Sequence, residues 1–521
     1  MKDKDLDQRQ AAGIDRRQLI KGAAAGAGAL ALPGAALAQA PRRGGTLRVA
    51  IPFNPAAIDP MTGRNLPDFD TLYAIFDALI DFEPKTLELK PGLAKSWRFA
   101  DQKTLVLDLV EGVTFHDGTP FNPEAVKLNV ERYKTDPRSN VKADLVTVDG
   151  VEVTGRSQVA FKLNRPNAGL PVMLTNRIGL MVSPKLIQEK GPNLDRLAVG
   201  TGPFKFVEWQ DNASIKLVRN DNYWKAGQPY LDGIEFRIIN ELNTVARSAI
   251  AGEVDLALNL QPQQKAIADR SSNVVASANP SLVFWGAFLN YAKPPLNDLR
   301  VRQAMNYALN REEINKVIAL GLGRPSSVIL PQEHWACDSA TANYYTFDLD
   351  RAKALLTEAG YPNGLEIESF GWADQVSMQR QELIISQLAK AGIRIRLTPV
   401  SPQQAMQSFM IETKGSMHIS PAGGFPDPSQ AYEALFGGSA LRNAGKVELP
   451  GFRELMDATM SAADLEARKA AFANLQRFVV ENALQLVQYV APGVVIQSKK
   501  LQNFQDNLLT TPKLHEVWLS A

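Results

Sequence analysis

The chain has 521 residues, of which 45% are hydrophobic and 21% charged, and its formal net charge is +2. These values are typical of a globular protein with enough apolar residues for two or more cores, and they exclude a largely disordered chain. They also argue against nucleic acid or an anionic membrane as the partner, because either requires a strongly basic face.

Residues 1–38 have the pattern of an export signal. A basic start containing Arg16-Arg17 is followed by an uncharged stretch, residues 22–37, and by Ala36-Leu37-Ala38. The stretch is shorter than the ~20 residues that span a bilayer, which favours a cleaved signal over a retained anchor. The arginine pair indicates the twin-arginine route. This segment carries six Lys/Arg and four Asp/Glu, so the remaining chain, with 51 of each, is neutral.

From residue 44 onward, predicted strands and helices alternate as in α/β lobes. Short apolar runs predict strands over 46–51 and 104–110. Asp298 is placed to cap a helix over 299–309, in which apolar residues recur at helical spacing. Asn310 and Glu313 resemble a capping box for a second helix that ends at Gly321, and Asp348 caps a third that ends at Gly360.

Residues 365–397 predict a βαβ unit. Alternating apolar residues over 365–370 and 393–397 flank an amphipathic helix that contains Leu383, Ile384 and Leu388. Such units build open sheets whose ligand sites lie beyond the carboxyl ends of the strands.

The sequence contains no recognisable catalytic or cofactor motif. It has no Gly-x-Ser-x-Gly, His-Glu-x-x-His, Cys-x-x-Cys or phosphate loop. The four histidines are far apart in sequence, which argues against a histidine metal site, and Cys337, the only cysteine, has no internal disulfide partner. We therefore expect no catalytic residue, no metal and no cofactor.

Several segments, read in order, resemble the family 5 extracellular solute-binding proteins, the group that contains the dipeptide-, oligopeptide- and nickel-binding proteins of ABC importers. The similarity covers essentially the whole chain after the signal. It is carried by Gly44-Gly-Thr-Leu-Arg-Val-Ala50, Leu89-Lys-Pro-Gly-Leu-Ala-Lys-Ser-Trp97, Gly112-Val-Thr-Phe-His-Asp-Gly-Thr-Pro-Phe-Asn122, Gly200-Thr-Gly-Pro-Phe-Lys-Phe206, Arg219-Asn-Asp-Asn-Tyr-Trp224, residues 290–304 and 353–364, and Val517-Trp518-Leu519.

The resemblance implies an α/β fold of the type II periplasmic-binding-protein class, with two lobes, a hinge and an extra subdomain in the first lobe. Residues 39–80, 198–285 and 488–521 would form the core of lobe I, residues 81–197 the extra subdomain, and residues 286–487 lobe II. Two strand crossovers would act as the hinge, and the ligand would be enclosed when the lobes close.

Candidate ligand-binding residues lie where strands end at the expected cleft. They are Phe53 and Asn54 after the first strand, Trp285 near a crossover, Trp372 after the strand over 365–370, and Phe425. Arg177 lies in a segment that approaches the cleft in family members, where its guanidinium could hold a carboxylate. Core packing for the aromatic residues, and a surface or interlobe salt bridge for Arg177, are the alternatives.

One departure from the peptide-binding members concerns their Gly-Trp-x-x-Asp segment, whose aspartate anchors the peptide amine. Aligned on Asp427-Pro428, the tryptophan position falls on Pro421 and the aspartate position on Gly424. A buried ammonium without a counter-charge is costly. We therefore expect that ordinary free-amine peptides are not the preferred ligands.

The resemblance implies a periplasmic substrate-binding protein of an ABC importer, soluble and monomeric after signal cleavage. It would capture a small organic solute, peptide-like or other, and deliver it to an inner-membrane permease, with the ATPase on a separate chain. The alternatives are a periplasmic hydrolase with an unrecognised carboxylate pair, and a chaperone or sensor on the same fold that docks a protein partner.

Overall fold

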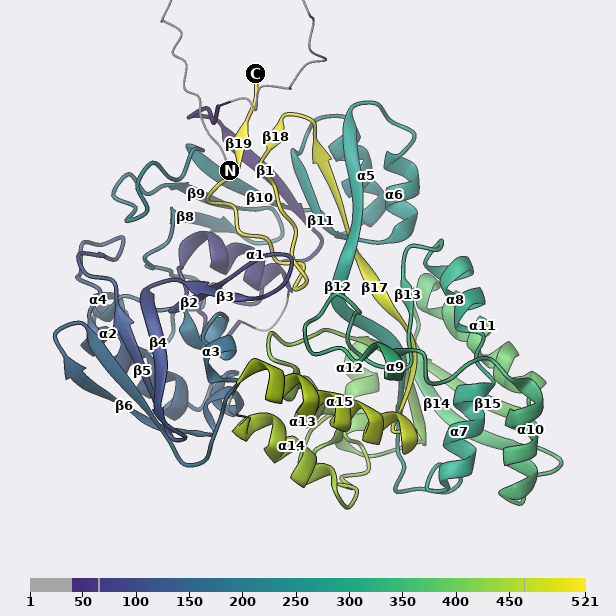
Figure 1. The fold of residues 1–521 in the computed structure, drawn as a ribbon. Coiled ribbons are helices and arrows are strands. Elements are labelled where there is room, and N and C mark those ends of the chain that lie inside the picture. The colour runs from purple at the N-terminus through teal and green to yellow at the C-terminus, as the bar shows by residue number, and fades with distance from the viewer. Residues whose placement is uncertain (1–39, 64–65, 463) are drawn as a thin grey trace, which may run out of the picture. The chain divides into compact units, whose positions relative to one another are not determined.

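The computed structural model describes residues 40–63, 66–462 and 464–521, and residues 42–521 form one unit. The expected export signal, residues 1–38, lies outside the described residues. A mixed sheet runs through this unit in the order β15-β14-β16-β12-β17-β11-β1-β10-β9-β8, and β13 pairs with β17 (Figure 1). The strands are β1 (Thr46–Ile51), β8 (Phe204–Gln210), β9 (Ser214–Arg219), β10 (Gly233–Ile238), β11 (Leu256–Leu260), β12 (Val274–Leu289), β13 (Arg324–Pro325), β14 (Leu365–Trp372), β15 (Ile393–Val400), β16 (Met417–Ala422) and β17 (Gln485–Ser498).

The sheet contains two parallel groups joined by long antiparallel strands. On one side β1 runs parallel to β10 and β11, and on the other β14 runs parallel to β15 and β16. Between them, β12 and β17 pair with each other in antiparallel fashion; β12 also pairs with β16 of one group, and β17 with β11 of the other. These two strands therefore connect the parallel groups.

The register of the β12–β17 pairing shifts at two points, between Pro280 and Phe284 and between Trp285 and Gly286. Pro280 pairs with Pro492, and the next regular pair is Phe284 with Val490. In the gap, the hydroxyl of Ser281 donates to the carbonyl of Ala491 at 2.7 Å. Interruptions of a ladder of this kind bend the strands locally.

Residues 78–190 form a smaller α/β region with its own core. Its antiparallel sheet has the order β4-β5-β7-β6. The strands and helices are β2 (Ile80–Phe82), β3 (Leu89–Pro91), β4 (Ala94–Asp101), β5 (Thr104–Leu109), α2 (Pro123–Thr135), β6 (Val148–Gly155), β7 (Gln158–Leu163), α3 (Leu170–Met173), α4 (Pro184–Lys190) and the 3-10 helices η1 (Lys142–Leu145) and η2 (Arg177–Gly179). Leu105, Leu107, Tyr133 and Phe161 are buried in this core.

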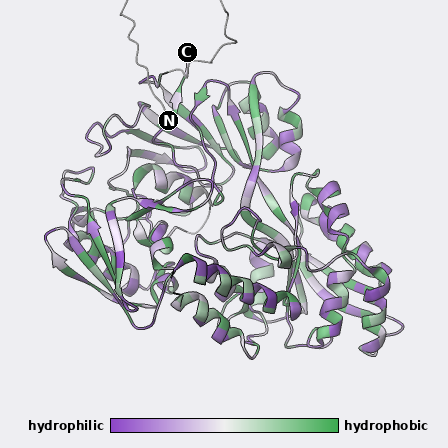
Figure 2. Ribbon diagram, in the orientation of Figure 1, coloured by the Kyte–Doolittle hydropathy of each residue, from purple (hydrophilic) through white to green (hydrophobic). Residues whose placement is uncertain are grey.

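Helices cover the sheet and extend beyond it. Figure 2 shows hydrophobic residues concentrated along the strands and on the helix faces that pack against them. The remaining elements are α1 (Leu66–Ile75), α5 (Leu242–Ile250), α6 (Pro262–Ala268), α7 (Leu299–Tyr307), α8 (Arg311–Ile318), α9 (Ser339–Ala342), α10 (Leu349–Glu358), α11 (Gln375–Lys390), α12 (Pro402–Ala405), the π-helix η3 (Met406–Ile411), α13 (Pro428–Phe436), α14 (Phe452–Ser461), α15 (Leu465–Glu481), β18 (Leu501–Gln502) and β19 (Trp518–Leu519). Among the described residues no helix is long and apolar enough to span a bilayer.

The local predictions are confirmed, with one correction. The βαβ unit is formed by β14, α11 and β15, and the carboxylates of Asp298 and Asp348 cap α7 and α10. The side chain of Asn310 caps α8 by accepting from the Glu313 N–H, but the return half of the expected capping box is absent. Instead, the side-chain oxygen of Gln387 accepts the Asn310 N–H at 3.0 Å, so α11 replaces Glu313 in that role. The division into lobes at residues 80, 197, 285 and 487 stays a prediction.

Candidate functional site

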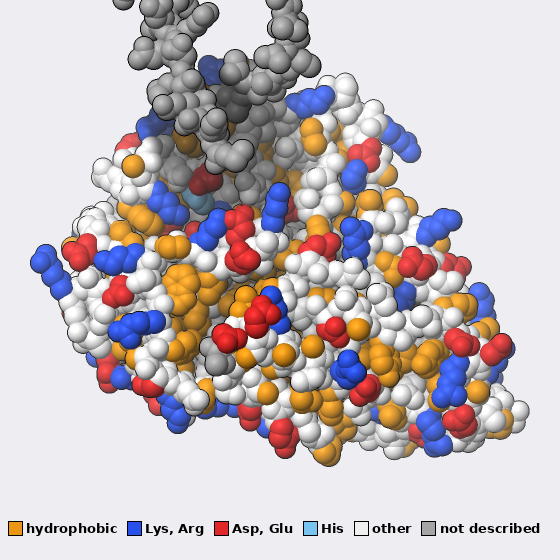
Figure 3. Space-filling model, in the orientation of Figure 1, with side chains coloured by type: hydrophobic (Ala, Val, Ile, Leu, Met, Phe, Trp, Pro, Cys, Tyr) orange, Lys and Arg blue, Asp and Glu red, His pale blue; other side chains and the backbone are white. Residues whose placement is uncertain are grey.

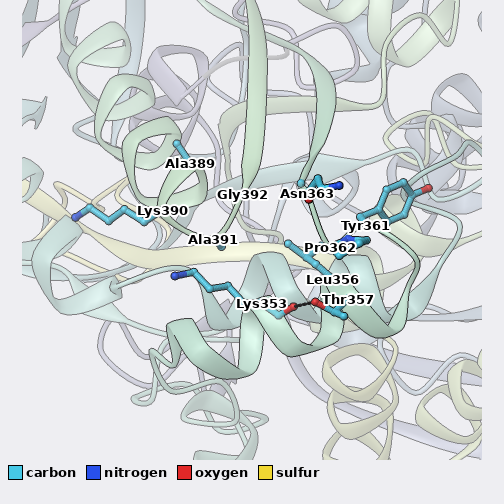
Figure 4. Close-up of a pocket in the computed structure, with 11 residues that line it drawn as sticks. Lys353, Leu356, Thr357, Tyr361, Pro362, Asn363, Ala389, Lys390, Ala391 and Gly392 are labelled. Atoms are coloured by element: carbon cyan, nitrogen blue, oxygen red, sulfur yellow. Dashed lines mark hydrogen bonds between the residues drawn. The ribbon is translucent and has the colours of Figure 1, made fainter.

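One open pocket lies between the C-terminal ends of α10 and α11. Its volume is about 330 Å³, and Figure 4 shows the side chains of Lys353 and Lys390 extending along its edge, with Tyr361 at its other end. Both lysines are exposed. Because Lys390 lies in the last turn of α11, where the helix dipole stabilises a cation, we assign it a structural role.

A larger cavity, of about 600 Å³, lies between residues 140–177 and residues 425–460. Its apolar wall includes Val146, Pro166, Met173, Phe425, Ala434, Leu441, Met456 and Met460. Its charged residues are Asp144, Arg165, Arg177, Glu433, Arg442, Arg453 and Asp457. Figure 3 shows hydrophobic side chains gathered around α3 on this face of the molecule. A mainly apolar cavity with a few convergent polar groups is the usual form of a small-molecule site.

Direct contacts join the two sides of this cavity. The side-chain amide of Gln430, on α13, donates to the carboxylate of Asp144, on η1, at 2.7 Å. The backbone N–H of Ala168 donates to the carbonyl of Met460 at 2.8 Å. Burial raises the pKa of Asp144, and the nearby Arg177 and the Gln430 hydrogen bond act in the opposite direction. Residues 140–177 are therefore fastened to α13 and α14.

A buried ion pair supports the wall made by α13. The guanidinium of Arg468, on α15, binds both carboxylate oxygens of Asp427 at 2.7 and 2.9 Å. Asp427 also caps α13 by accepting the Ser429 N–H at 3.0 Å. A Cβ atom built on Gly169 would lie 2.8 Å from the Arg468 guanidinium, so the opposite segment touches this pair directly.

Arg177 lines the cavity and already has a hydrogen-bond acceptor. Its guanidinium donates to the carbonyl of Gly63, and its Cζ lies 5.5 Å from the centroid of the Phe69 ring. Burial lowers the pKa of Arg177, and the carboxylate of Asp144 opposes this effect.

Arg453 and Arg442 differ in how their charges are compensated. Arg453 binds both oxygens of Glu433, at 2.8 and 3.1 Å, and also pairs with Glu448. Arg442 has no hydrogen bond or ion pair among the described residues, and its Cζ lies 5.8 Å from the centroid of Phe425. Burial lowers the pKa of Arg442.

The predicted tryptophans lie together but do not line this cavity. Trp285, on β12, packs edge to face against Trp372, at the end of β14, with ring centroids 6.1 Å apart. The Cζ of Arg380, on α11, lies 3.3 Å from the centroid of Trp285, and Arg380 donates to the hydroxyl of Tyr489 at 3.1 Å. One face of Trp285 is therefore covered by a cation of the protein itself.

Phe53 and Asn54 also lie outside the cavity wall. The Phe53 side chain is 61% exposed. The Asn54 side chain accepts from the Trp209 indole at 3.2 Å and from the Asn212 N–H at 3.1 Å, and donates to Asp211 at 3.1 Å. It thus fastens the end of β1 to the β8–β9 hairpin. Of the six predicted residues, Arg177 and Phe425 are the two that share the large cavity.

Gly424 has no room for a side chain. A Cβ atom there would lie 2.0 Å from the Leu282 Cβ and 2.7 Å from the Leu282 carbonyl oxygen. Pro421 lies in β16 and pairs with Trp285 on β12. The backbone around residue 424 would therefore have to move before an aspartate could occupy the position.

We expect Gly424→Asp to destabilise the protein without creating an amine anchor. Overpacking of this kind typically costs about 1–3 kcal/mol. Gly423→Asp is the matched control, because no described atom lies within 4 Å of its Cβ position, and it should change stability by less than ~0.5 kcal/mol. Urea unfolding midpoints and calorimetry with alanyl-alanine provide the measurements. A Gly424→Asp protein with the control's stability, or with gained dipeptide affinity, would contradict this account.

The remaining titratable groups give no catalytic arrangement. Burial raises the pKa of the Cys337 thiol to about 12, which keeps it protonated at neutral pH. Within the described ranges, no group of three or more His, Cys, Asp and Glu side chains is placed to hold a metal ion.

Comparisons with known proteins give a consistent result. The family described as bacterial extracellular solute-binding proteins, family 5 middle, matches residues 88–443. The glutathione-binding protein GsiB of Escherichia coli K12 is 28% identical over 374 residues, which is 70% of this chain and 71% of GsiB. DppA of Helicobacter pylori, solved with the peptide STSA, superimposes with a TM-score of 0.79 at 24% identity, over 92% of this chain and 99% of DppA. AgaA of A. tumefaciens R10, solved with agropinic acid, has a TM-score of 0.79 at 23% identity and the same coverages.

Proposed function

Because the chain belongs to family 5 of the bacterial extracellular solute-binding proteins and is the substrate-binding protein of an ABC importer, we propose that it captures a small organic solute in the cavity between residues 140–177 and 425–460. The chain is a binding protein and not an enzyme. Its sequence has no phosphate loop, so the importer's ATPase is a separate chain that acts with the permease.

The proposed site is supported by the cavity and by the hydrogen bonds that join its two walls. A volume of about 600 Å³ suits a small organic molecule. The Gln430–Asp144 hydrogen bond and the Ala168–Met460 hydrogen bond hold the two walls together. A solute that contacts both walls adds its binding energy to these bonds and shifts the protein toward the closed form.

The interruption of the β12–β17 ladder provides the hinge in this proposal. Only these two long strands pass between the parallel groups of the described sheet, and their regular pairing stops between Pro280 and Phe284. Opening at this point separates the walls of the cavity while both groups keep their own strand pairing.

The preferred ligand in our proposal is not an ordinary free-amine peptide. Gly424 has no space for an aspartate, and Glu433, a carboxylate in the cavity wall, is already bound to Arg453. The names of the relatives show that this scaffold accepts varied solutes, since GsiB binds glutathione and AgaA was solved with agropinic acid. A non-peptide or modified peptide solute therefore fits this cavity better than a dipeptide.

We place the protein in the periplasm as a monomer, exported by the twin-arginine route. The support for the route is the Arg16-Arg17 pair ahead of the uncharged stretch. Replacing both arginines with lysine in the full chain should prevent its accumulation in the periplasmic fraction. Unchanged accumulation would instead indicate the general export route.

The proposed site is tested by filling it. Wild-type protein, expressed with its own leader and purified from the periplasm, is expected to carry a small molecule in native mass spectrometry. Ala434→Trp, on α13, places an indole in the cavity and should abolish this co-purification. Ala458→Trp, at an exposed position of α14 outside the cavity wall, should retain the molecule. Equal retention by both variants would show that the solute binds elsewhere, and an empty wild-type protein would contradict capture.

A further inference from the structure

Arg442 has an unusual environment for a cation inside a protein. It lies between α13 and α14, and it lines both the large cavity and a void of about 10 Å³ beside Leu282 and Gly424. Among the described residues its guanidinium has no hydrogen-bond acceptor and no carboxylate partner. A guanidinium withdrawn from water without such partners is destabilising, and proteins normally compensate the charge.

The other arginines of the cavity show that Arg442 is different. Arg453 is neutralised by Glu433 and Glu448, and Arg177 donates to the carbonyl of Gly63. Arg165 is exposed, so water solvates its charge. Arg442 alone of these four is partly buried without a described acceptor.

The described groups near Arg442 do not compensate its charge. Its one described polar contact is with the face of Phe425, at 5.8 Å from the ring centroid, which is near the outer limit of a cation–π interaction. Burial is the cause of the lowered pKa of Arg442, so no neighbouring carboxylate offsets the loss of hydration. An anion from outside the protein would supply the acceptor that the described residues do not.

We infer that Arg442 anchors an oxyanion of the captured solute, a carboxylate in the first instance, while Phe425 and the methionines of the cavity wall contact its apolar part. This inference rests on the proposed capture of a solute in the same cavity. The planar guanidinium can donate two parallel hydrogen bonds to such a group, which fixes its orientation. The solute is thus an organic anion, held by its acidic end.

The test compares wild-type protein with Arg442→Gln and with Arg394→Gln, an exposed arginine of β15 that does not line the cavity. The full chains are purified from the periplasm, and the small molecules released on denaturation are quantified per mole of protein. Wild type and Arg394→Gln should carry the same acidic molecule, and Arg442→Gln should carry roughly 10- to 100-fold less of it. Elemental composition distinguishes a carboxylate from a phosphate or sulfonate.

A second measurement separates anchoring from a structural role. Ligand-free Arg442→Gln should unfold at a temperature equal to or above that of ligand-free wild type, because the substitution removes an uncompensated charge. A lowered unfolding temperature would identify Arg442 as a structural residue. Retention of the acidic molecule by Arg442→Gln at the wild-type level, or a captured molecule without an acidic group, would overturn the inference and leave capture intact. An empty wild-type protein would overturn the proposed function and this inference with it.

Discussion

Replacing Arg468 with methionine is expected to lower the free energy of unfolding by about 3–5 kcal/mol. The side chains of Arg468 and Asp427 are 6% and 0% exposed, and the pair is joined by two hydrogen bonds. Removing the guanidinium leaves the Asp427 carboxylate buried without a counter-charge, which is the costly case for a buried ion pair. Urea unfolding at neutral pH measures the loss.

Lys469→Met is the control for this substitution. Lys469 is the next residue on α15, and it forms only an exposed pair with Glu466. Exposed pairs typically contribute about 0–1 kcal/mol, so the control should unfold close to wild type. A similar loss for both variants would mean that helix α15 itself, and not the buried pair, responds to the change.

The Asp427–Arg468 pair also predicts how the difference in unfolding free energy between wild type and Arg468→Met depends on pH. Burial acts to raise the pKa of Asp427, but the charge and hydrogen bonds of Arg468 together with the hydrogen bonds from Ser429 outweigh it, and the pKa is lowered. A carboxyl group with a lowered pKa stabilises the fold above its unfolded pKa, and this contribution is lost as the pH falls through the folded value. In Arg468→Met the buried Asp427 protonates more readily, so acidification relieves the variant's penalty. The stability gap between wild type and Arg468→Met should be largest near neutrality and narrow below about pH 4. A stability difference that does not change with pH would contradict the lowered pKa of Asp427 as its cause.

The sequence predicted local structure well because the determining interactions are local. The helix after Asp298 and the βαβ unit over 365–397 depend on caps and on apolar periodicity within a few residues. The capping box at Asn310 was only half right because its second partner, Gln387, comes from another helix 77 residues away. Local patterns therefore fail where a distant side chain takes over a local role.

The candidate site was harder to predict for the same physical reason. Its two walls are 286 residues apart in sequence at the Gln430–Asp144 hydrogen bond. The residues next to Arg442 in the sequence do not show that its side chain lacks a partner. This depends on the tertiary contacts of Glu433, Glu448 and Asp144, which bind other side chains. Of the aromatic residues predicted at the ends of strands, Phe425 lines the cavity, whereas Trp285 contacts Arg380, whose placement also depends on tertiary packing.

Substituting Gly169 with leucine is expected to hold the two walls of the cavity apart. The backbone at Gly169 has φ −82°, which any residue can adopt, so the substitution causes no local strain. Its Cβ would approach the Arg468 guanidinium to 2.8 Å and the Asp427 carboxylate to 2.9 Å, and both groups belong to the opposite wall. The clash therefore acts only when the walls are in contact.

The size of the effect on closure and on binding follows from the cost of the steric clash. Overpacking costs about 1–3 kcal/mol, which lowers the ratio of closed to open forms by roughly 5- to 150-fold and raises the apparent Kd of the solute by up to the same factor. Small-angle scattering of the ligand-free variant should show a larger radius of gyration than wild type. Gly150→Leu, in the same segment, is the control, because no described atom lies within 4 Å of its Cβ position. If Gly169→Leu scatters like wild type and binds the co-purified solute equally well, then residues 140–177 do not move against α13–α15, and the solute must enter by another route.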